Sequence, residues 1–412
     1  MSNSTDSRLE TNAPCHSTTV NADRPDKPKV VFVQHSLPNT GGAERVVFEL
    51  IRGLRKRNYA PVLACLYELG DLGERLKASG VRTHQNIVRG KLNPANAWRL
   101  RQVLRQENAD VLYVTNAFHN VLLGRLGAML AGTPLSVIAF HSYDTVYAQA
   151  EQHSSLKRGM SGLADRVSLP FYHRAIALAD SHKRYLSSVK RIPSAKIEVV
   201  HNGIDYERFA TDLSKSEARE RFGLPNNRKI VGIIARLNRC KSHDQFLKVA
   251  RLVHQQDARS LFVIAGTGPE QERLQEITLE YGLQESVVFL GHVSDVPPLL
   301  RAFDVTVLTS YHEALPLALL ESMAASVPVV CSDVGSVDAM VTDDYNGYRL
   351  PFGDNERFAD CVLRLLQDAE KAKRMGEAGR QLVESSFTLE KMAERTDRLL
   401  CQWTHRPSHS AQ

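Results

Sequence analysis

The amino-acid sequence predicts an α/β fold made of two Rossmann-like domains, each with a parallel sheet. Short apolar runs alternate with helical patterns along almost the whole chain, which is typical of βαβ units. A chain of 412 residues also exceeds what one hydrophobic core usually serves. The two halves repeat one order of elements without repeating a sequence, so two similar domains are expected.

The first domain is expected over residues 29–205 and the second over 206–385, divided by a turn at Asn202 and Gly203. Residues 1–28 are rich in Ser, Thr, Asn and Asp and are expected to form a disordered tail. The predicted strands are 29–36, 61–66, 81–87, 110–115, 134–140 and 196–201, then 229–234, 260–265, 286–290, 304–309 and 327–331. The predicted helices are 43–57, 71–79, 95–107, 119–131 and 154–173, then 243–256, 269–281, 295–302, one between the last two strands, 354–368, 370–385 and 388–402.

The stretch from 303 to 332 gives the clearest indication of a site. Two apolar strands flank a helix that is apolar almost all round, as in a parallel sheet covered on both faces. Glu321 lies on this helix and needs a partner or a ligand, because an unpaired buried charge costs several kcal/mol. Glu313 precedes the helix at the carboxyl end of a strand, where open α/β sheets bind ligands. The first turn is expected to offer an anion the free backbone N–H groups of Ala314, Leu315 and Leu317.

Eight residues at helical rise separate the two carboxylates by about 12 Å, the reach from a nucleotide's ribose to a sugar on its diphosphate. A simpler interpretation also fits the spacing. Glu313 can be favoured by the helix dipole, and Glu321 can form an ion pair inside the domain.

Residues at two other strand ends suit an anionic ligand. Gly41 and Gly42 form a turn where backbone can approach a phosphate, although glycine pairs often serve only the turn. Arg236 and Lys241 follow strand 229–234 and can neutralise a diphosphate, although exposed basic side chains are usually only solvated.

His141 follows strand 134–140, where a lone histidine is more often structural than catalytic. Ser242 and Gln245 fit a capping box for the next helix.

Six short motifs lie in order along the chain besides the Glu-x7-Glu pair. They are TGGAERVV at 40–47, FHSYD at 140–144, VVHNGID at 199–205, ARLNRCKS at 235–242, AGTGPE at 265–270 and SDVGS at 332–336. Together the motifs resemble those of retaining glycosyltransferases of the GT-B fold, family 4, also called glycosyl transferases group 1. The chain departs from the family pattern at three positions where glycine is usual, Ala314, Ser242 and Ser326.

The resemblance implies a hexosyltransferase that moves a sugar from a UDP- or GDP-sugar to a glycan acceptor with retention of configuration. It implies that His141 and Glu313 are the catalytic residues beside the reacting sugar. No side chain identifies itself as a nucleophile, so front-face attack by the acceptor is preferred to a covalent intermediate. The resemblance also implies that the two domains face each other across a cleft and that a helix within residues 386–412 crosses back toward the first domain. The donor-binding residues are expected to be Gly41, Gly42, Arg236, Lys241, Gly266, Ala314, Leu315, Pro316, Leu317 and Glu321.

Other classes fit the sequence less well. The sequence has no DxD motif and no clustered His or Cys ligands, so we expect no metal or other cofactor beside the nucleotide sugar. The first strand is not followed by GxGxxG, which argues against an NAD-dependent dehydrogenase. The residue pattern of the sugar-nucleotide epimerases is not found. A non-catalytic nucleotide-sugar-binding protein remains an alternative, although Glu313, Arg236 and Lys241 are all present.

The charge is unevenly distributed. Residues 29–205 hold 24 Lys and Arg against 13 Asp and Glu, a surplus of 11 positive charges, whereas residues 206–412 hold 25 against 29. Such a basic half can attract an anionic membrane, although solvated helix faces explain any single cluster. Six scattered cysteines favour a reducing compartment, and no nucleic-acid motif is present.

We therefore expect a cytoplasmic enzyme that binds reversibly, as a peripheral protein, to the inner face of the membrane. Its expected acceptor is a lipid-linked glycan in surface polysaccharide or lipopolysaccharide biosynthesis. A soluble small-molecule acceptor is the alternative, with the positive charge merely solvated.

Overall fold

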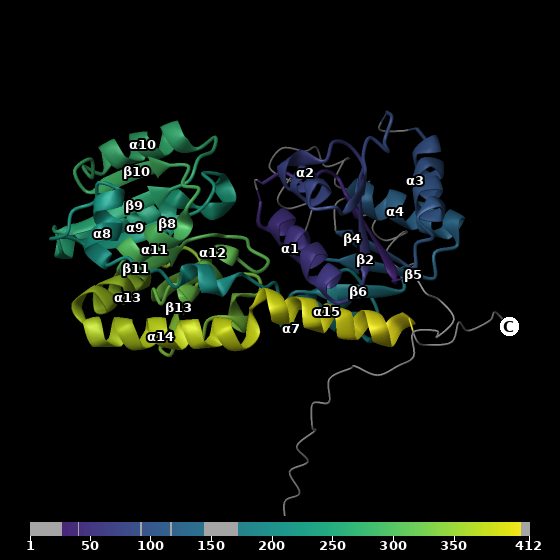
Figure 1. The fold of residues 1–412 in the computed structure, drawn as a ribbon. Helices are drawn as coiled ribbons and strands as arrows, with labels where there is room; N and C mark the ends of the chain where they lie inside the picture. The colour runs from purple at the N-terminus through teal and green to yellow at the C-terminus, as the bar shows by residue number, and fades with distance from the viewer. Residues whose placement is uncertain (1–26, 40, 91–92, 116–117, 144–171, 405–412) are drawn as a thin grey trace, which may run out of the picture.

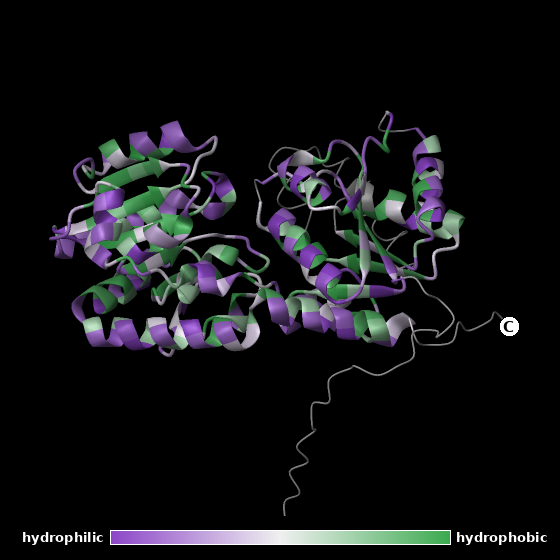
Figure 2. Ribbon diagram, in the orientation of Figure 1, coloured by the Kyte–Doolittle hydropathy of each residue, from purple (hydrophilic) through white to green (hydrophobic). Residues whose placement is uncertain are grey.

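The computed structural model describes residues 27–39, 41–90, 93–115, 118–143 and 172–404. The predicted helix at 154–173 and nearly all of the predicted tail at 1–28 lie outside these residues. The described residues form two α/β units side by side (Figure 1). Two long helices lie along the same side of the molecule, one beside each unit. Apolar residues concentrate along the strands and polar residues on the outer helix faces (Figure 2).

The first sheet is parallel, with strand order β3-β2-β1-β4-β5-β6-β7. Its strands are β1 (Lys29–Gln34), β2 (Ala60–Cys65), β3 (Arg82–His84), β4 (Val111–Thr115), β5 (Leu135–Ala139), β6 (Arg174–Ala177) and β7 (Ile197–Val199). Its helices are α1 (Gly42–Lys56), α2 (Gly70–Ala78), α3 (Ala95–Gln106), α4 (Phe118–Ala131) and α7 (Asp180–Ser188). Helices α1 and α2 pack on one face, and α3, α4 and α7 pack on the other.

The second sheet is also parallel, with strand order β10-β9-β8-β11-β12-β13. Its strands are β8 (Lys229–Ile234), β9 (Ser260–Ala265), β10 (Val287–Gly291), β11 (Val305–Leu308), β12 (Val329–Ser332) and β13 (Gly347–Leu350). Its helices are α8 (Lys215–Arg221), α9 (His243–Gln256), α10 (Gln271–Glu280), α11 (Val296–Ala302), α12 (Leu317–Ala324), α13 (Asn355–Gln367) and α14 (Ala369–Ser386). The prediction of two Rossmann-like parallel sheets is confirmed.

Strands β6 and β13 and helices α7 and α8 were not predicted from the sequence. Strand β13 follows the polar turn at 342–346 and begins at a glycine. A Cβ on Gly347 would lie 2.7 Å from Cγ2 of Val329, so only glycine lets the edge strand approach β12 this closely. Strand β13 has the sequence GYRL and is not a continuous apolar run, so it lacks the pattern by which β11 and β12, of the same length, were predicted.

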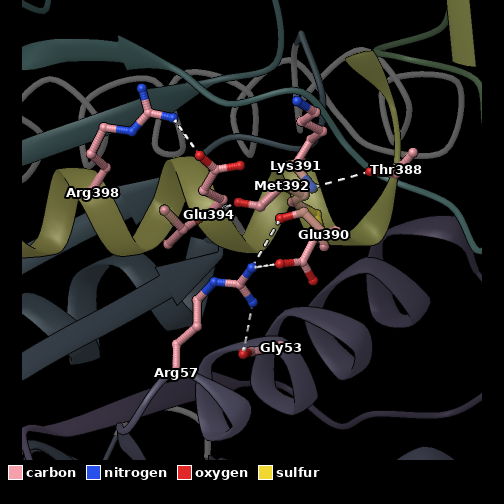
Figure 3. A network of polar contacts seen from close by, with 9 residues as sticks. Gly53, Arg57, Thr388, Glu390, Lys391, Met392, Glu394 and Arg398 are labelled. Carbon is pink, nitrogen blue, oxygen red and sulfur yellow. Dashed lines mark hydrogen bonds and ion pairs between the residues drawn. The ribbon is translucent and has the colours of Figure 1, made fainter. Parts of the chain in front are cut away.

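The last helix, α15 (Leu389–Thr404), lies against α1 of the first domain. Gly53 lets the two helices approach, because a Cβ there would lie 2.7 Å from Cβ of Ala393. Arg57 forms an ion pair with Glu390 and donates to the carbonyl of Gly53 at 3.3 Å (Figure 3). Tyr59 donates to Asp397 at 2.8 Å. The chain thus returns from the second domain and adds α15 to the core of the first.

A partly buried ion cluster lies at the amino ends of the second sheet's strands. Asp304 accepts from Lys215 at 2.6 Å, from Arg219 at 2.8 Å and from the backbone N–H of Ile230 at 2.6 Å. Only 7% of the Arg219 side chain is exposed, so its charge depends on this carboxylate.

We expect Asp304→Ala to destabilise the second domain by about 3 kcal/mol, because it leaves Arg219 buried without its partner. The matched control is Asp295→Ala, which removes an Arg221 partner at 2.9 Å where both side chains are about half exposed. The control should cost less than about 1 kcal/mol. Thermal unfolding measures both variants, and equal losses would contradict the importance of burial.

Candidate functional site

Glu313 lies in the loop between β11 and α12, at the carboxyl end of the second sheet. Only 8% of it is exposed, and its Oε1 accepts from Nζ of Lys241 and from Oγ of Ser310, both at 2.6 Å. No donor to Oε2 is found among the residues that the structure describes. One carboxylate oxygen is therefore fixed, and the other remains available to a ligand.

Lys241 is held by the loop that precedes Glu313. Thr309 donates to the carbonyls of Lys241 and Ser242, at 3.2 and 2.9 Å. The predicted capping box of Ser242 and Gln245 is wrong, because Ser242 adopts a left-handed conformation (φ 45°, ψ 52°) and its side chain caps no helix N–H. Its hydroxyl donates back to the carbonyl of Arg239 at 3.3 Å instead.

Arg236 and Gly266 lie at adjacent strand ends. Gly266 has φ of +146°, and a Cβ there would lie 1.9 Å from the carbonyl oxygen of Ala235. Glycine is therefore required for the loops after β8 and β9 to meet. Arg236 is exposed and belongs to the same loop after β8 as Lys241.

Helix α12 begins later than the sequence indicated. It starts at Leu317, with Pro316 as its N-cap and no side-chain cap, so Ala314 and Leu315 belong to the preceding loop. Their N–H groups are not part of the helix's first turn, which corrects the prediction. The carbonyl of Ala314 accepts from the backbone N–H of Ser336 at 2.8 Å, which fixes the loop against the segment after β12.

Glu321 lies on α12 and faces the first domain. Its side chain is 13% exposed and lies 3.5 Å from Nη1 of Arg45 on α1. Burial raises the pKa of Glu321, and the positive charges of Arg45 and Arg208 oppose that rise. Glu321 therefore has the partner that its position requires, and the partner comes from the other domain.

The turn at Gly41 and Gly42 contacts the same region. A Cβ on Gly42 would lie 3.2 Å from Cδ1 of Leu317, so the beginnings of α1 and α12 face each other. Gly41 is the extended N-cap of α1, and a Cβ there would meet only the flexible end of Glu44. The close approach, rather than backbone strain, explains Gly42.

His141 follows β5 in the first domain. Burial lowers the pKa of His141 to about 4, so the imidazole is neutral at neutral pH. The neighbouring His182 is fully buried, and its pKa is also lowered to about 4 by burial and by His141. A neutral His141 can exchange hydrogen bonds with a sugar hydroxyl without adding charge.

A cavity of about 730 Å³ lies elsewhere, at the amino ends of the second sheet's strands. Basic side chains in this cavity donate hydrogen bonds to backbone carbonyls at the ends of helices and strands. Arg219 donates to the carbonyl of Ala302 at 3.1 Å, and Arg228 donates to that of Glu285 at 2.8 Å. The charge there complements backbone carbonyls, so this cavity is not the candidate site. No group of three or more potential metal-ligating side chains is found within the described ranges.

The partners of the candidate residues were not predicted from the sequence, although they lie in or near the motifs. Ser310 lies three residues before Glu313, Arg45 is in TGGAERVV, and Ser336 is in SDVGS.

Two family descriptions match the chain, leaving only residues 209–213 between them. Residues 40–208 match Glycosyltransferase Family 4, and residues 214–382 match Glycosyl transferases group 1.

Two curated relatives differ in the acceptors that their names state. The chain is 26% identical to the UDP-Gal:alpha-D-GlcNAc-diphosphoundecaprenol alpha-1,3-galactosyltransferase of Escherichia coli, covering 65% of this chain and 69% of that protein. It is 27% identical to the N-acetyl-alpha-D-glucosaminyl L-malate synthase of Bacillus anthracis, covering 72% and 76%. Among solved structures, Anabaena HepE in complex with UDP aligns with a TM-score of 0.77 and 19% identity, covering 91% of this chain and 100% of that one.

Proposed function

The chain belongs to family 4 of the glycosyltransferases, with the GT-B fold, and from this premise we propose that it transfers a sugar from a nucleotide-diphosphate sugar to a glycan acceptor with retention of configuration. The observation that carries the proposal is the contact between Glu313 and Lys241 at the carboxyl edge of the second sheet. Glu313 can accept hydrogen bonds from sugar hydroxyls, and Lys241 supplies a positive charge to the leaving diphosphate.

The roles follow from position and charge. Lys241 and the exposed Arg236 stabilise the negative charge that develops on the departing diphosphate. Oε2 of Glu313 orients the transferred sugar, and His141 contacts the sugar from the first domain. The acceptor hydroxyl attacks from the side of the leaving group, and the departing phosphate takes its proton. Glu321, with Arg45, binds the ribose.

UDP is the nucleotide that the comparisons favour. The E. coli relative is named for UDP-Gal, and the HepE structure contains UDP. We extend the proposal to a UDP-sugar donor. A GDP-sugar is the alternative.

The site is proposed to work without a metal. Lys241, Arg236 and the uncapped start of α12 together supply the positive charge that a divalent cation otherwise provides.

The acceptor is proposed to be a lipid-linked glycan in polysaccharide or lipopolysaccharide biosynthesis, as the name of the E. coli relative suggests. The name of the B. anthracis relative, which includes L-malate, supports the alternative of a soluble acceptor. No helix in the described ranges has the length and apolarity that a bilayer crossing requires.

The surface formed by α3 and α4 supports contact with an anionic membrane. It exposes Trp98 on α3 and Leu126, Met129 and Leu130 on α4. Arg101 joins the two helices, since it stacks 4.0 Å from the Trp98 ring and donates to the carbonyl of Leu130 at 3.1 Å. Neither helix contains Asp or Glu, whereas the two together contain four arginines. Apolar and basic groups side by side suit an anionic lipid surface.

We expect Glu321→Ala to weaken donor binding and Glu313→Gln chiefly to slow transfer, because Glu313 is proposed to orient the transferred sugar and Glu321 to bind the ribose. Donor binding is measured by thermal stabilisation with UDP- and GDP-sugars, where a ligand at a hundredfold its Kd adds about 2.7 kcal/mol. Transfer is measured with radiolabelled donor. Normal affinity and turnover in both variants would contradict these roles, and a wild type that no nucleotide sugar stabilises would contradict the proposed function.

We expect Lys241→Ala or Arg236→Ala to lower turnover by about a hundredfold, as loss of a charge-stabilising donor typically does. Arg259→Ala, at an exposed position in the same domain, is the control. EDTA should leave wild-type turnover unchanged. Loss of turnover in EDTA, with recovery in magnesium or manganese, would show that a metal is required.

We expect the protein to float with vesicles containing anionic lipid at low salt, and binding to fall as salt rises. Trp98→Ser combined with Met129→Ser should reduce the bound fraction severalfold, whereas Leu279→Ser, at an exposed position on α10, should not. Vesicle binding that does not depend on salt, or an equal loss of binding in the double variant and in Leu279→Ser, would contradict the proposed membrane contact and favour a soluble acceptor.

A further inference from the structure

Two motifs that the proposed function has not fully used meet across the domain boundary. Tyr143 lies in FHSYD after β5 of the first domain, and Ser336 lies in SDVGS after β12 of the second. The Tyr143 hydroxyl is 2.9 Å from Oγ of Ser336. A side-chain hydrogen bond therefore joins the domains next to the candidate site.

This bond is the end of a chain of hydroxyl groups with one consistent direction. Oδ1 of Asp338 accepts from Ser181 at 2.8 Å, and Ser181 accepts from Tyr143 at 3.3 Å. Because the Tyr143 proton is used in that bond, its oxygen accepts from Ser336. Arg184 lies 3.9 Å from the other oxygen of Asp338, so the chain of hydroxyl groups ends at a carboxylate that also faces a cation. Hydrogen bonds in such a chain polarise and strengthen one another.

The ring of Tyr143 is held in place independently of its hydroxyl. It stacks on the imidazole of His182, with centroids 4.4 Å apart and planes 18° from parallel. His182 is fully buried and accepts from the backbone N–H of Leu178 at 3.3 Å. The hydroxyl is therefore directed at Ser336 by a rigid support, and removing it leaves the packing intact.

Ser336 supports the backbone of Glu313. Its N–H donates to the carbonyl of Ala314 at 2.8 Å, and Ser336 is fully buried. The adjacent Gly335 has φ of +65°, and a Cβ there would lie 2.0 Å from the carbonyl oxygen of Glu313. Gly335 and Ser336 thus contact the backbone of Glu313 and Ala314, while Lys241 binds the carboxylate of Glu313.

We propose that Tyr143 is a positioning residue, which uses its hydrogen bond to Ser336 to set the loop of Glu313 when the two domains are together. Tyr143 itself contacts no reacting group. The proposal rests on the role of Glu313 in the proposed function and adds a link by which the acceptor-side domain orients the donor-side carboxylate.

The test uses Tyr143→Phe, which keeps the stacked ring and removes only the hydroxyl, and Ser336→Ala. Each variant should lower kcat about five- to tenfold, the value of one hydrogen bond, with the donor KM unchanged within about twofold. Because both changes remove the same bond, the double variant should be no slower than the slower single variant. Tyr345→Phe and Ser188→Ala, at exposed positions outside the hydroxyl chain, are the matched controls.

Amide hydrogen exchange gives a readout that does not depend on activity. The Ser336 N–H should exchange faster in Tyr143→Phe than in wild type, while the melting temperature stays within a few degrees. Unchanged kcat and unchanged exchange in Tyr143→Phe, or multiplicative losses in the double variant, would overturn the proposal. If Glu313→Gln transfers normally, the proposed function fails instead; if Glu313→Gln is impaired while Tyr143→Phe is normal, only this inference fails.

Discussion

A buried carboxylate must have partners, and the arrangement of the site follows from how Glu313 obtains them. Because β8 and β11 are neighbours in the second sheet, the loops that follow them end side by side. One loop supplies Lys241 and the other supplies Glu313, and Thr309 ties them through two backbone carbonyls. The ion pair is therefore a consequence of strand order. Lys241 is therefore already oriented at the edge where the nucleotide-sugar donor is proposed to bind.

The same edge shows where backbone conformation limits the sequence. Gly266 and Gly335 lie where a Cβ would collide with a carbonyl oxygen. By contrast, Ser242 at this edge has φ of 45°, and Ser326, at the opposite edge before β12, has φ of 57°, although the family usually has glycine at both positions. A serine in this region costs on the order of 1 kcal/mol. These departures therefore lower stability a little without changing the backbone path, whereas Ala314 has no such strain.

Regular local patterns predicted the parallel sheets, the position of Glu313 after a strand and that of Glu321 on a helix. Alternation and strand ends can be recognised within one segment. Contacts between distant segments could not be predicted in the same way. Arg45 and Glu321 are 276 residues apart in the chain, and Tyr143 and Ser336 are 193 apart. The failed capping box of Ser242 has a different cause, since its residue types matched but a tertiary contact from Thr309 selected another backbone conformation. Roles in catalysis remain predictions, because they depend on a bound donor.

The two domains are joined by contacts of unequal strength. At the site, Arg45 is nearly half exposed and its ion pair with Glu321 contributes less than about 1 kcal/mol, and the Tyr143 hydrogen bond contributes a similar amount. On α15, Met392, Leu399 and Leu400 are almost fully buried in the core of the first domain, and each contributes about 1.5 to 3 kcal/mol. The domains therefore separate at the site more easily than α15 leaves the first domain. A hinge motion would therefore break the contacts that support the Glu313 loop before it displaced α15.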